Sequence, residues 1–327
     1  MNRNITLCCL LLYCIASTAA QQPTKQEIKQ AVDSIISLVR NNYVFADKAA
    51  QIANAIAAKH KAAHYDNLPS WKAVDSALTH DLKTASNDGH MYVRYDTQMV
   101  KELSTPDTSQ LSNSEDPFYY GQKAVQNNFG FKEVKVLDCN IGYIRLSEIN
   151  ISEKSLPVLI SSMKFVANTR ALIIDLRNNG GGGSSIGSVI ESFFLPKGTP
   201  LLQLKNRAQQ QQIDHTVSWL TEPKYTNPLY IIVNKKTFSA AEAVAFSLQQ
   251  TRRAIIVGQP SGGGAHMNSW YPINRHLYLS VSTAAPTLTG TDKNWEGKGV
   301  IPDVVTGEGS ELEQIFQLIN KSKSAER

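Results

Sequence analysis

The 327-residue chain has few cysteines, no long apolar run and no cluster of positive charge. Three of its four cysteines (Cys8, Cys9 and Cys14) lie near the N-terminus, in a segment that reads as a cleaved leader. Cys139 would then remain alone, which excludes an internal disulfide and a cysteine metal site. We expect Cys139 to be buried and inert. No segment approaches the roughly 18 consecutive apolar residues of a membrane span.

Several motifs of known enzyme classes are missing as well. The chain has no H-E-x-x-H and no C-x-x-C, so no metal site is predicted, and it lacks the G-x-S-x-G elbow of α/β-hydrolases. It also lacks the phosphate loop G-x-x-x-x-G-K-[ST], and no cofactor is predicted. The net charge of +5 is scattered along the chain, which argues against a nucleic-acid partner.

Residues 1–20 resemble a secretory signal peptide. Arg3 supplies the positive start, Ile5 to Ile15 the apolar centre, and Ser17 to Ala20 the small residues before a cleavage site. Export of a chain without disulfides is typical of a bacterial periplasm or exterior, so we expect a periplasmic or extracellular protein.

The rest of the chain changes its pattern once. Residues 21–103 are predicted to form a small helical domain, because apolar residues recur there at spacings of three and four. Residues 104–117 are polar and rich in turn formers, which predicts a linker. Residues 118–327 alternate short strands with helices, which favours an α/β catalytic domain. The strands are expected at 131–137, 141–145, 171–176 and 229–233, with a closing helix at 309–322.

The segment around Ser239 is the most informative one. An apolar strand, Leu229 to Val233, is followed by a turn and by an Ala-rich helix that begins near Ser239. A serine at such a turn lies beside the free N–H groups of the helix start, which suit a nucleophile. The same residues, with Glu242 three positions later, also form the capping box S-x-x-E, which only starts a helix.

Other candidate groups are scattered along the sequence. Two glycine-rich turns, Asp175 to Ser184 and Ser261 to His266, could cradle an anion, form an oxyanion hole or a groove wall, or be plain turns. Among the histidines, His90 stands out because Asn-Asp-Gly precedes it and turns it away from a helix. Glu296, beside a tryptophan and a glycine, is a candidate acid to orient it. The remaining histidines are His60, His64, His80, His215, His266 and His276.

Five segments, in this order, resemble one peptidase superfamily. They are Asp88-Gly89-His90, DLRNNGGG (175–182), FSAAE (238–242), VGQPSGGGAH (257–266) and NWEGKGVIPD (294–303). They are similar to the tail-specific (C-terminal processing) peptidases, particularly the branch of the tricorn core peptidase and the interphotoreceptor retinoid-binding protein. The resemblance implies a crotonase/Clp-like α/β spiral preceded by a helical subdomain.

The resemblance also implies roles for individual residues. The C-terminal processing branch uses a lysine 25 positions after the nucleophile, and that position here is Gly264. The tricorn-like branch uses a histidine and a glutamate, which match His90 and Glu296. Ser239 would attack the carbonyl, His90 would act as base, and Glu296 would orient the imidazole. Backbone N–H groups of Gly182 and Ala240 would bind the oxyanion.

Three functions compete on these grounds. The first is an exported serine peptidase with a peptide or protein substrate. The second is a non-catalytic module of the same fold that binds an apolar, retinoid- or lipid-like ligand. The third is an acyl-CoA enzyme of crotonase type, which the leader argues against. Retention of serine, histidine and glutamate at the three matching places favours the peptidase. The sequence leaves the oligomeric state open.

Overall fold

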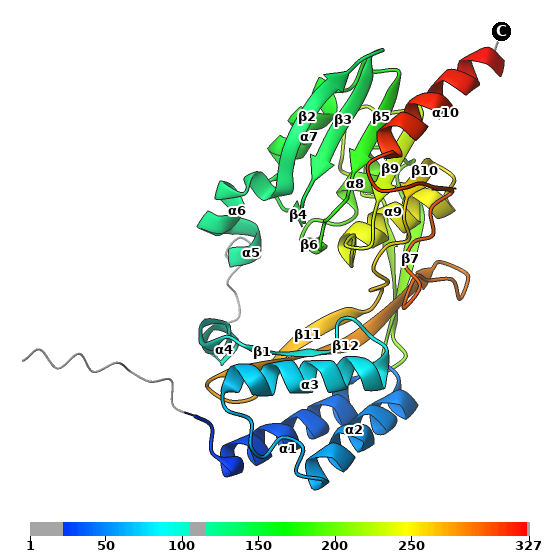
Figure 1. Cartoon of the computed structure of the whole chain (residues 1–327). Coiled ribbons are helices and arrows are strands. Elements are labelled where there is room, and N and C mark those ends of the chain that lie inside the picture. The colour runs from blue at the N-terminus through cyan, green and yellow to red at the C-terminus, as the bar shows by residue number, and fades with distance from the viewer. Residues whose placement is uncertain (1–21, 105–115, 326–327) are drawn as a thin grey trace, which may run out of the picture.

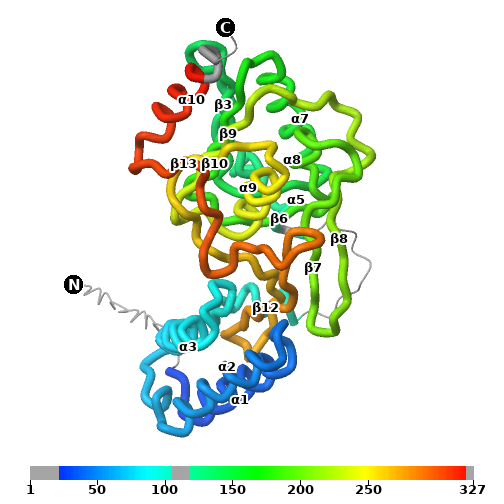
Figure 2. The backbone as a smooth tube through the Cα atoms, turned by 90° about the vertical axis from the view of Figure 1, so that its right-hand side faces the viewer, coloured from blue at the N-terminus to red at the C-terminus, as the bar shows by residue number. Residues whose placement is uncertain are grey.

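The computed structural model describes residues 22–104 and 116–325. The predicted leader and most of the predicted linker lie outside these residues. The described chain has two parts, a layer of helices with an antiparallel sheet and, above it in Figure 1, a larger unit around a mostly parallel sheet. Figure 2 shows the same two parts from the side, with β12 in orange where they meet.

Three helices form the outer layer of the N-terminal part: α1 (Lys25–Asn42), α2 (Ala46–Lys61) and α3 (Trp71–Ser86). Thr24 and Glu27 form a capping box at the start of α1, and the predicted cap at Ser70 is confirmed, since its hydroxyl accepts the Ala73 amide. The apolar stripe of α1, Ile28 to Val39, is buried against the other helices and the sheet.

An antiparallel sheet completes this part. It contains β1 (Tyr92–Tyr95), β7 (Pro200–Asn206), β8 (Gln211–His215), β11 (Met267–Pro272) and β12 (Leu277–Leu288). The first half of β12 pairs with β1 and its second half with β7. Leu277, Leu279 and Val281 of β12 are fully buried in the same core as the N-terminal helices. The N-terminal part is therefore not built by residues 21–103 alone.

The larger unit is centred on a six-stranded sheet of order β13-β10-β9-β5-β3-β2, parallel except for β2. Its strands are β2 (Phe131–Leu137), β3 (Ile141–Leu146), β5 (Ala171–Asp175), β9 (Leu229–Val233), β10 (Ala254–Gly258) and β13 (Val304–Val305). Strands β5 and β9 are buried along their whole length, as continuous apolar runs should be in a covered parallel sheet.

Helices cover both faces of this sheet. One face packs against α7 (Leu156–Phe165), α8 (Val189–Ser192) and α9 (Ala240–Gln250). The opposite face packs against α10 (Glu311–Ala325) through Ile315 and Ile319. The predicted α/β class with a helical N-terminal part is confirmed.

Several smaller elements complete the described chain. They are α4 (Thr97–Ser104), α5 (Pro117–Tyr120), α6 (Gln122–Gln126), a 3-10 turn (Asn128–Gly130), and the short parallel strands β4 (Ile149–Ile151) and β6 (Gly182–Ser184). Cys139 corrects one expectation. It is exposed rather than buried, because it occupies the tight β2–β3 turn with a φ of 60°.

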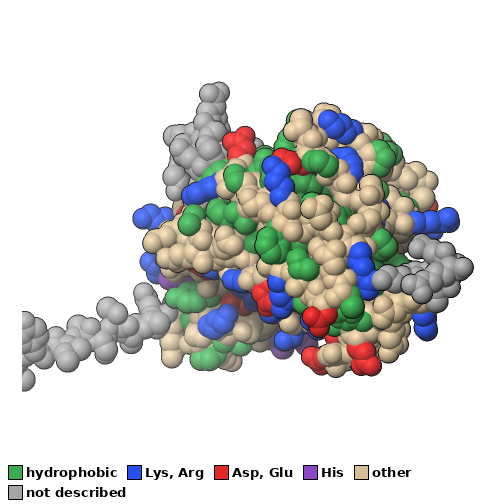
Figure 3. Space-filling model, turned by 90° about the horizontal axis from the view of Figure 1, so that it is seen from above, with side chains coloured by type: hydrophobic (Ala, Val, Ile, Leu, Met, Phe, Trp, Pro, Cys, Tyr) green, Lys and Arg blue, Asp and Glu red, His purple; other side chains and the backbone are tan. Residues whose placement is uncertain are grey.

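The surface agrees with the scattered charge of the sequence. Figure 3 shows Lys and Arg interspersed with Asp and Glu on the face that it displays. Over residues 22–104 and 116–325, none of the helices combines the length and the apolar character needed to cross a membrane.

Candidate active site

Ser239 lies at the turn between β9 and α9, as the sequence predicts. Its backbone has φ 53° and ψ −123°, a positive φ that costs energy in a residue other than glycine. Bonds on both sides of the turn hold this shape. The Phe238 amide donates to the Asn179 carbonyl (2.9 Å), and the Ser239 amide donates to Glu242 Oε2 (2.8 Å). The glycine-rich turn after β5 therefore braces the serine turn after β9.

His90 reaches the same point from the N-terminal part. It follows α3 through Asn87, whose left-handed conformation ends that helix. The His90 amide donates to Asp88 Oδ1 (2.8 Å), and its carbonyl accepts the Ser280 hydroxyl (2.6 Å). Its Nε2 lies 3.1 Å from Ser239 Oγ. The structure thus brings Ser239 and His90 within hydrogen-bond distance across 149 positions of sequence.

The environment of His90 keeps its imidazole neutral. Burial lowers the pKa to about 4, and the nearby His266 acts in the same direction against the opposing effect of Asp88. A neutral imidazole can accept the proton of the serine hydroxyl, which a general base must do. If Nε2 is the acceptor, the ring proton sits on Nδ1, a buried atom that has no hydrogen-bond partner among the described residues.

Phe238 fills the space around this pair. Its ring centroid lies 4.8 Å from that of His90. A Cβ added to Gly264 would lie 2.1 Å from Phe238 Cζ, and one added to Gly89 would lie 2.8 Å from it. Neither position has room for a side chain. The packing gives a physical reason why position 264 holds no lysine.

The residues predicted to supply oxyanion donors, Gly182 and Ala240, lie in the two segments that meet at the serine turn. Ala240 is the first residue of α9, where the helix dipole favours negative charge. Gly181 packs directly against the serine, since a Cβ there would lie 2.7 Å from Ser239 Cβ. Gly182 follows with φ 125° and begins β6. Gly181 thus packs against the serine turn, and the oxyanion role of Gly182 and Ala240 stays a prediction.

Glu296 does not contact His90 in this structure. Its Oε2 accepts the amides of Ala265 (2.6 Å) and His266 (3.2 Å). Its Oε1 is buried and, within the described parts of the chain, unpaired. Burial raises the pKa of Glu296, and the carboxylate of Asp88 adds to this effect, whereas His266 opposes it. The structure therefore brings together two of the three predicted side chains, and it places the third against His266.

Asp88 and His266 form a pair that the sequence reasoning missed. His266 Nδ1 lies 2.7 Å from Asp88 Oδ2, and both side chains are at least 95% buried. Hydrogen bonds and the charge of His266 outweigh burial and hold the pKa of Asp88 at about 2, so the carboxylate is ionised and Nδ1 must donate. Both residues lie inside motifs of the sequence, but 178 positions apart. Nothing in the order of residues signalled that they meet.

The same pair offers ligand atoms together with Glu296. Atoms of Asp88, His266 and Glu296 lie within 4.8 Å of one another, a grouping that could hold a metal ion. In this structure His266 Nδ1 and Glu296 Oε2 are already engaged in hydrogen bonds. Hydrogen bonds thus occupy these two ligand atoms, whereas Glu296 Oε1 has no partner among the described residues.

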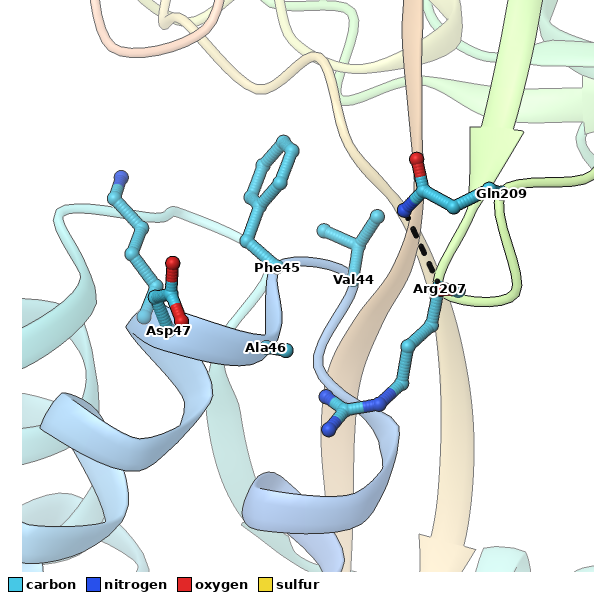
Figure 4. A pocket seen from close by; sticks show the side chains of 7 residues that line it. Val44, Phe45, Ala46, Asp47, Arg207 and Gln209 are labelled. Carbon is cyan, nitrogen blue, oxygen red and sulfur yellow. Dashed lines mark hydrogen bonds between the residues drawn. The ribbon is translucent and has the colours of Figure 1, made fainter.

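A cavity of about 560 Å³ opens beside this cluster. It lies between the start of α2 and the β7–β8 turn, and Figure 4 shows Phe45 and Arg207 projecting from its two sides. The Arg207 guanidinium donates to the Tyr43 carbonyl (2.7 Å), and the Phe45 ring centroid lies 5.6 Å from that of His266. The Phe45 ring thus lines the cavity and also contacts His266.

Comparisons with known proteins find relatives of both parts of the chain. Residues 140–306 match the family model of peptidase family S41, and residues 20–130 match the N-terminal domain of Peptidase_S41 in eukaryotic IRBP. A carboxy-terminal-processing protease of Bartonella bacilliformis is 30% identical over 192 residues, covering 56% of this chain and 43% of the relative. A chloroplastic carboxyl-terminal-processing peptidase 2 of Arabidopsis thaliana is 31% identical, covering 50% of this chain and 31% of the relative. The chain spans less than half the length of these curated relatives.

Solved structures share the fold. A putative peptidase from Parabacteroides merdae has a TM-score of 0.59 at 18% identity, covering 90% of this chain and 96% of that one. The tricorn protease has a TM-score of 0.52 at 14% identity, covering 91% of this chain and 37% of that one. At these identities the likeness concerns the fold.

Proposed function

The chain belongs to peptidase family S41, and on that premise we propose that it is an exported serine peptidase with Ser239 as nucleophile and His90 as general base. The observation that carries the proposal is the 3.1 Å separation between Ser239 Oγ and His90 Nε2. The low pKa of His90, about 4, supports it because the base is unprotonated at neutral pH. Signal-like residues 1–20 support export.

The proposed reaction runs in two stages. His90 takes the Ser239 proton as the serine oxygen bonds to the substrate carbonyl carbon. The carbonyl oxygen becomes an anion beside the amides of Gly182 and Ala240; one such donor is typically worth about 3 kcal/mol in the transition state. His90 then gives the proton to the leaving amine, and the C–N bond breaks. Water, deprotonated by His90, cleaves the resulting ester and restores the serine.

The predicted role of Glu296 stays part of the proposal in a modified form. Its carboxylate accepts the His266 amide and does not contact His90, which argues for an indirect action. The substrate is proposed to be a peptide or protein.

A fluorophosphonate probe tests this function without a known substrate. We expect wild-type protein to be labelled at Ser239, mapped by peptide mass spectrometry, and S239A and H90A to lose labelling. S239A should keep its unfolding free energy within about 1 kcal/mol, the size of one helix cap. N-terminal sequencing of the protein recovered from a bacterial periplasm would test removal of residues 1–20 in the same sample.

A matched control separates catalysis from capping. Ser70 also caps a helix, because its hydroxyl accepts the Ala73 amide, and it has no proposed role in catalysis. S70A should lose stability and keep the label. Folded wild-type protein that stays unlabelled would overturn the peptidase proposal and favour the apolar-ligand module.

A further inference from the structure

The side chain of His90 is held from one side only. Its Nε2 contacts the Ser239 hydroxyl, and the Phe238 ring packs beside the imidazole. The other ring nitrogen, Nδ1, has no partner in the described part of the chain. The main chain is fixed more firmly, by Asp88 at the amide and Ser280 at the carbonyl. The position of the ring therefore depends on what holds Asp88.

Asp88 is held by groups from three parts of the chain. Its Oδ2 accepts His266 Nδ1 (2.7 Å) and the Tyr43 hydroxyl (3.2 Å), while its Oδ1 accepts the His90 amide (2.8 Å). A hydrogen bond with an ionised partner is stronger than a neutral one, and burial strengthens it further. Loss of the His266 donor would leave the Asp88 carboxylate buried with one strong partner fewer.

Glu296 contacts His266, the next residue along this path. Its Oε2 accepts the His266 amide at 3.2 Å and lies 3.7 Å from His266 Nδ1. Hydrogen bonds therefore connect Glu296 to the His266 amide, the His266 ring to Asp88, and Asp88 to the His90 amide. Glu296 thus fixes the main chain of His266, the residue whose imidazole donates to the Asp88 carboxylate.

From this chain of contacts we propose that Glu296 acts on His90 through His266 and Asp88, which are positioning residues of the catalytic base. The inference rests on the proposed function, because it assumes that His90 activates Ser239. A direct or water-bridged contact between Glu296 and His90 would be a different mechanism. The two mechanisms make opposite predictions about how substitutions combine.

A double-mutant cycle distinguishes them, measured as the second-order rate constant of fluorophosphonate labelling of Ser239. We expect E296Q and H266L each to lower this constant at least tenfold, and the double variant to be no slower than the slower single variant, because members of one unit are not additive. A double variant whose loss equals the product of the single losses would overturn the relay. Wild-type rates in H266L would overturn it as well.

Two further variants separate positioning from stability. H266N keeps an N–H donor near the place of Nδ1, so it should recover part of the rate lost in H266L; equal rates in the two would contradict a positioning role. H80N, at an exposed histidine of α3, should label like wild type. Should H266L not fold, the same cycle is run with H266N, with a smaller expected loss and the same criterion of non-additivity.

The outcome for the relay is independent of the outcome for the proposed function. Unlabelled wild-type protein removes the peptidase proposal itself. Labelled wild-type protein with an additive cycle removes only the relay and leaves Ser239 and His90 in place.

Discussion

At the residue scale, the charge state of His90 decides whether the site can work. Its imidazole is 5% exposed, and this burial lowers its pKa while Asp88 opposes and His266 and Lys83 reinforce the shift. The result, about 4, lies well below the ordinary value of 6.5. The imidazole is therefore neutral at pH 7 and can accept a proton there.

This value predicts the acid side of the pH profile. The labelling rate constant of Ser239 should be constant near pH 7 and should fall on acidification with a midpoint near the pKa of about 4, because the base becomes protonated only there. The rate constant is measured at a series of pH values in buffers of constant ionic strength, by quenching the labelling reaction at successive times. A midpoint between pH 6 and 7 would contradict the neutral, buried base.

At the element scale, the start of α9 depends on one carboxylate. Glu242 is fully buried, and each of its oxygens accepts two donors. Oε2 accepts the amides of Ser239 and Gly264, and Oε1 accepts the Gly263 amide and the Ser261 hydroxyl. The capping interaction that the S-x-x-E pattern predicts is thus present together with the contact between Ser239 and His90. Glu242 joins the serine turn to the second glycine-rich turn.

The variant E242Q should disturb both turns. A glutamine has one acceptor oxygen, so its NH₂ group would face two of the four donors, each costing about 1–3 kcal/mol if left unpaired. We expect a lower melting temperature and a reduced labelling rate of Ser239. Glu308 is exposed, and E308Q is the matched control that should change neither. Wild-type labelling and stability in E242Q would contradict the account.

At the scale of the whole molecule, sequence patterns predicted the parallel sheet far better than the antiparallel one. Strands β5 and β9 are continuous apolar runs whose burial needs no knowledge of partners. Strands β8 and β11 are mostly exposed or half-buried, and β1 pairs with β12, whose residues lie more than 180 positions later. Such pairing is set by the tertiary fold, so local pattern could not reveal it.

Some residues of the candidate site could be predicted from the sequence, and others could not. Ser239 and His90 were found from a local turn pattern and from the resemblance, and they meet. The Asp88–His266 pair and the four donors of Glu242 were not found, because each depends on loops that become neighbours only in the folded chain. The motif around Glu296 made it a candidate for orienting the base, but its contact with the His266 amide could not be predicted from the sequence.

Strand β12 contributes to the core of the N-terminal helices, although it follows most of the larger unit in sequence. We therefore predict that the stability of the N-terminal part and that of the larger unit are coupled. Leu279 of β12 is fully buried among the N-terminal helices, so L279A should lower the free energy of unfolding by about 2–5 kcal/mol. Chemical denaturation measures this change, and labelling of Ser239 should disappear at a lower denaturant concentration. Val305 is 68% exposed, and V305A should be close to neutral. Neutral behaviour of L279A would mean that β12 does not join the parts.

The bond from Ser280 to the His90 carbonyl has a consequence for biosynthesis. The base is synthesised early, but its support arrives some 190 residues later, together with the strand that seats it. Until Ser280 has been synthesised, this hydrogen bond cannot fix the position of His90 relative to Ser239. We therefore expect the contact between Ser239 and His90 to form late in folding, after β12 has paired with β1.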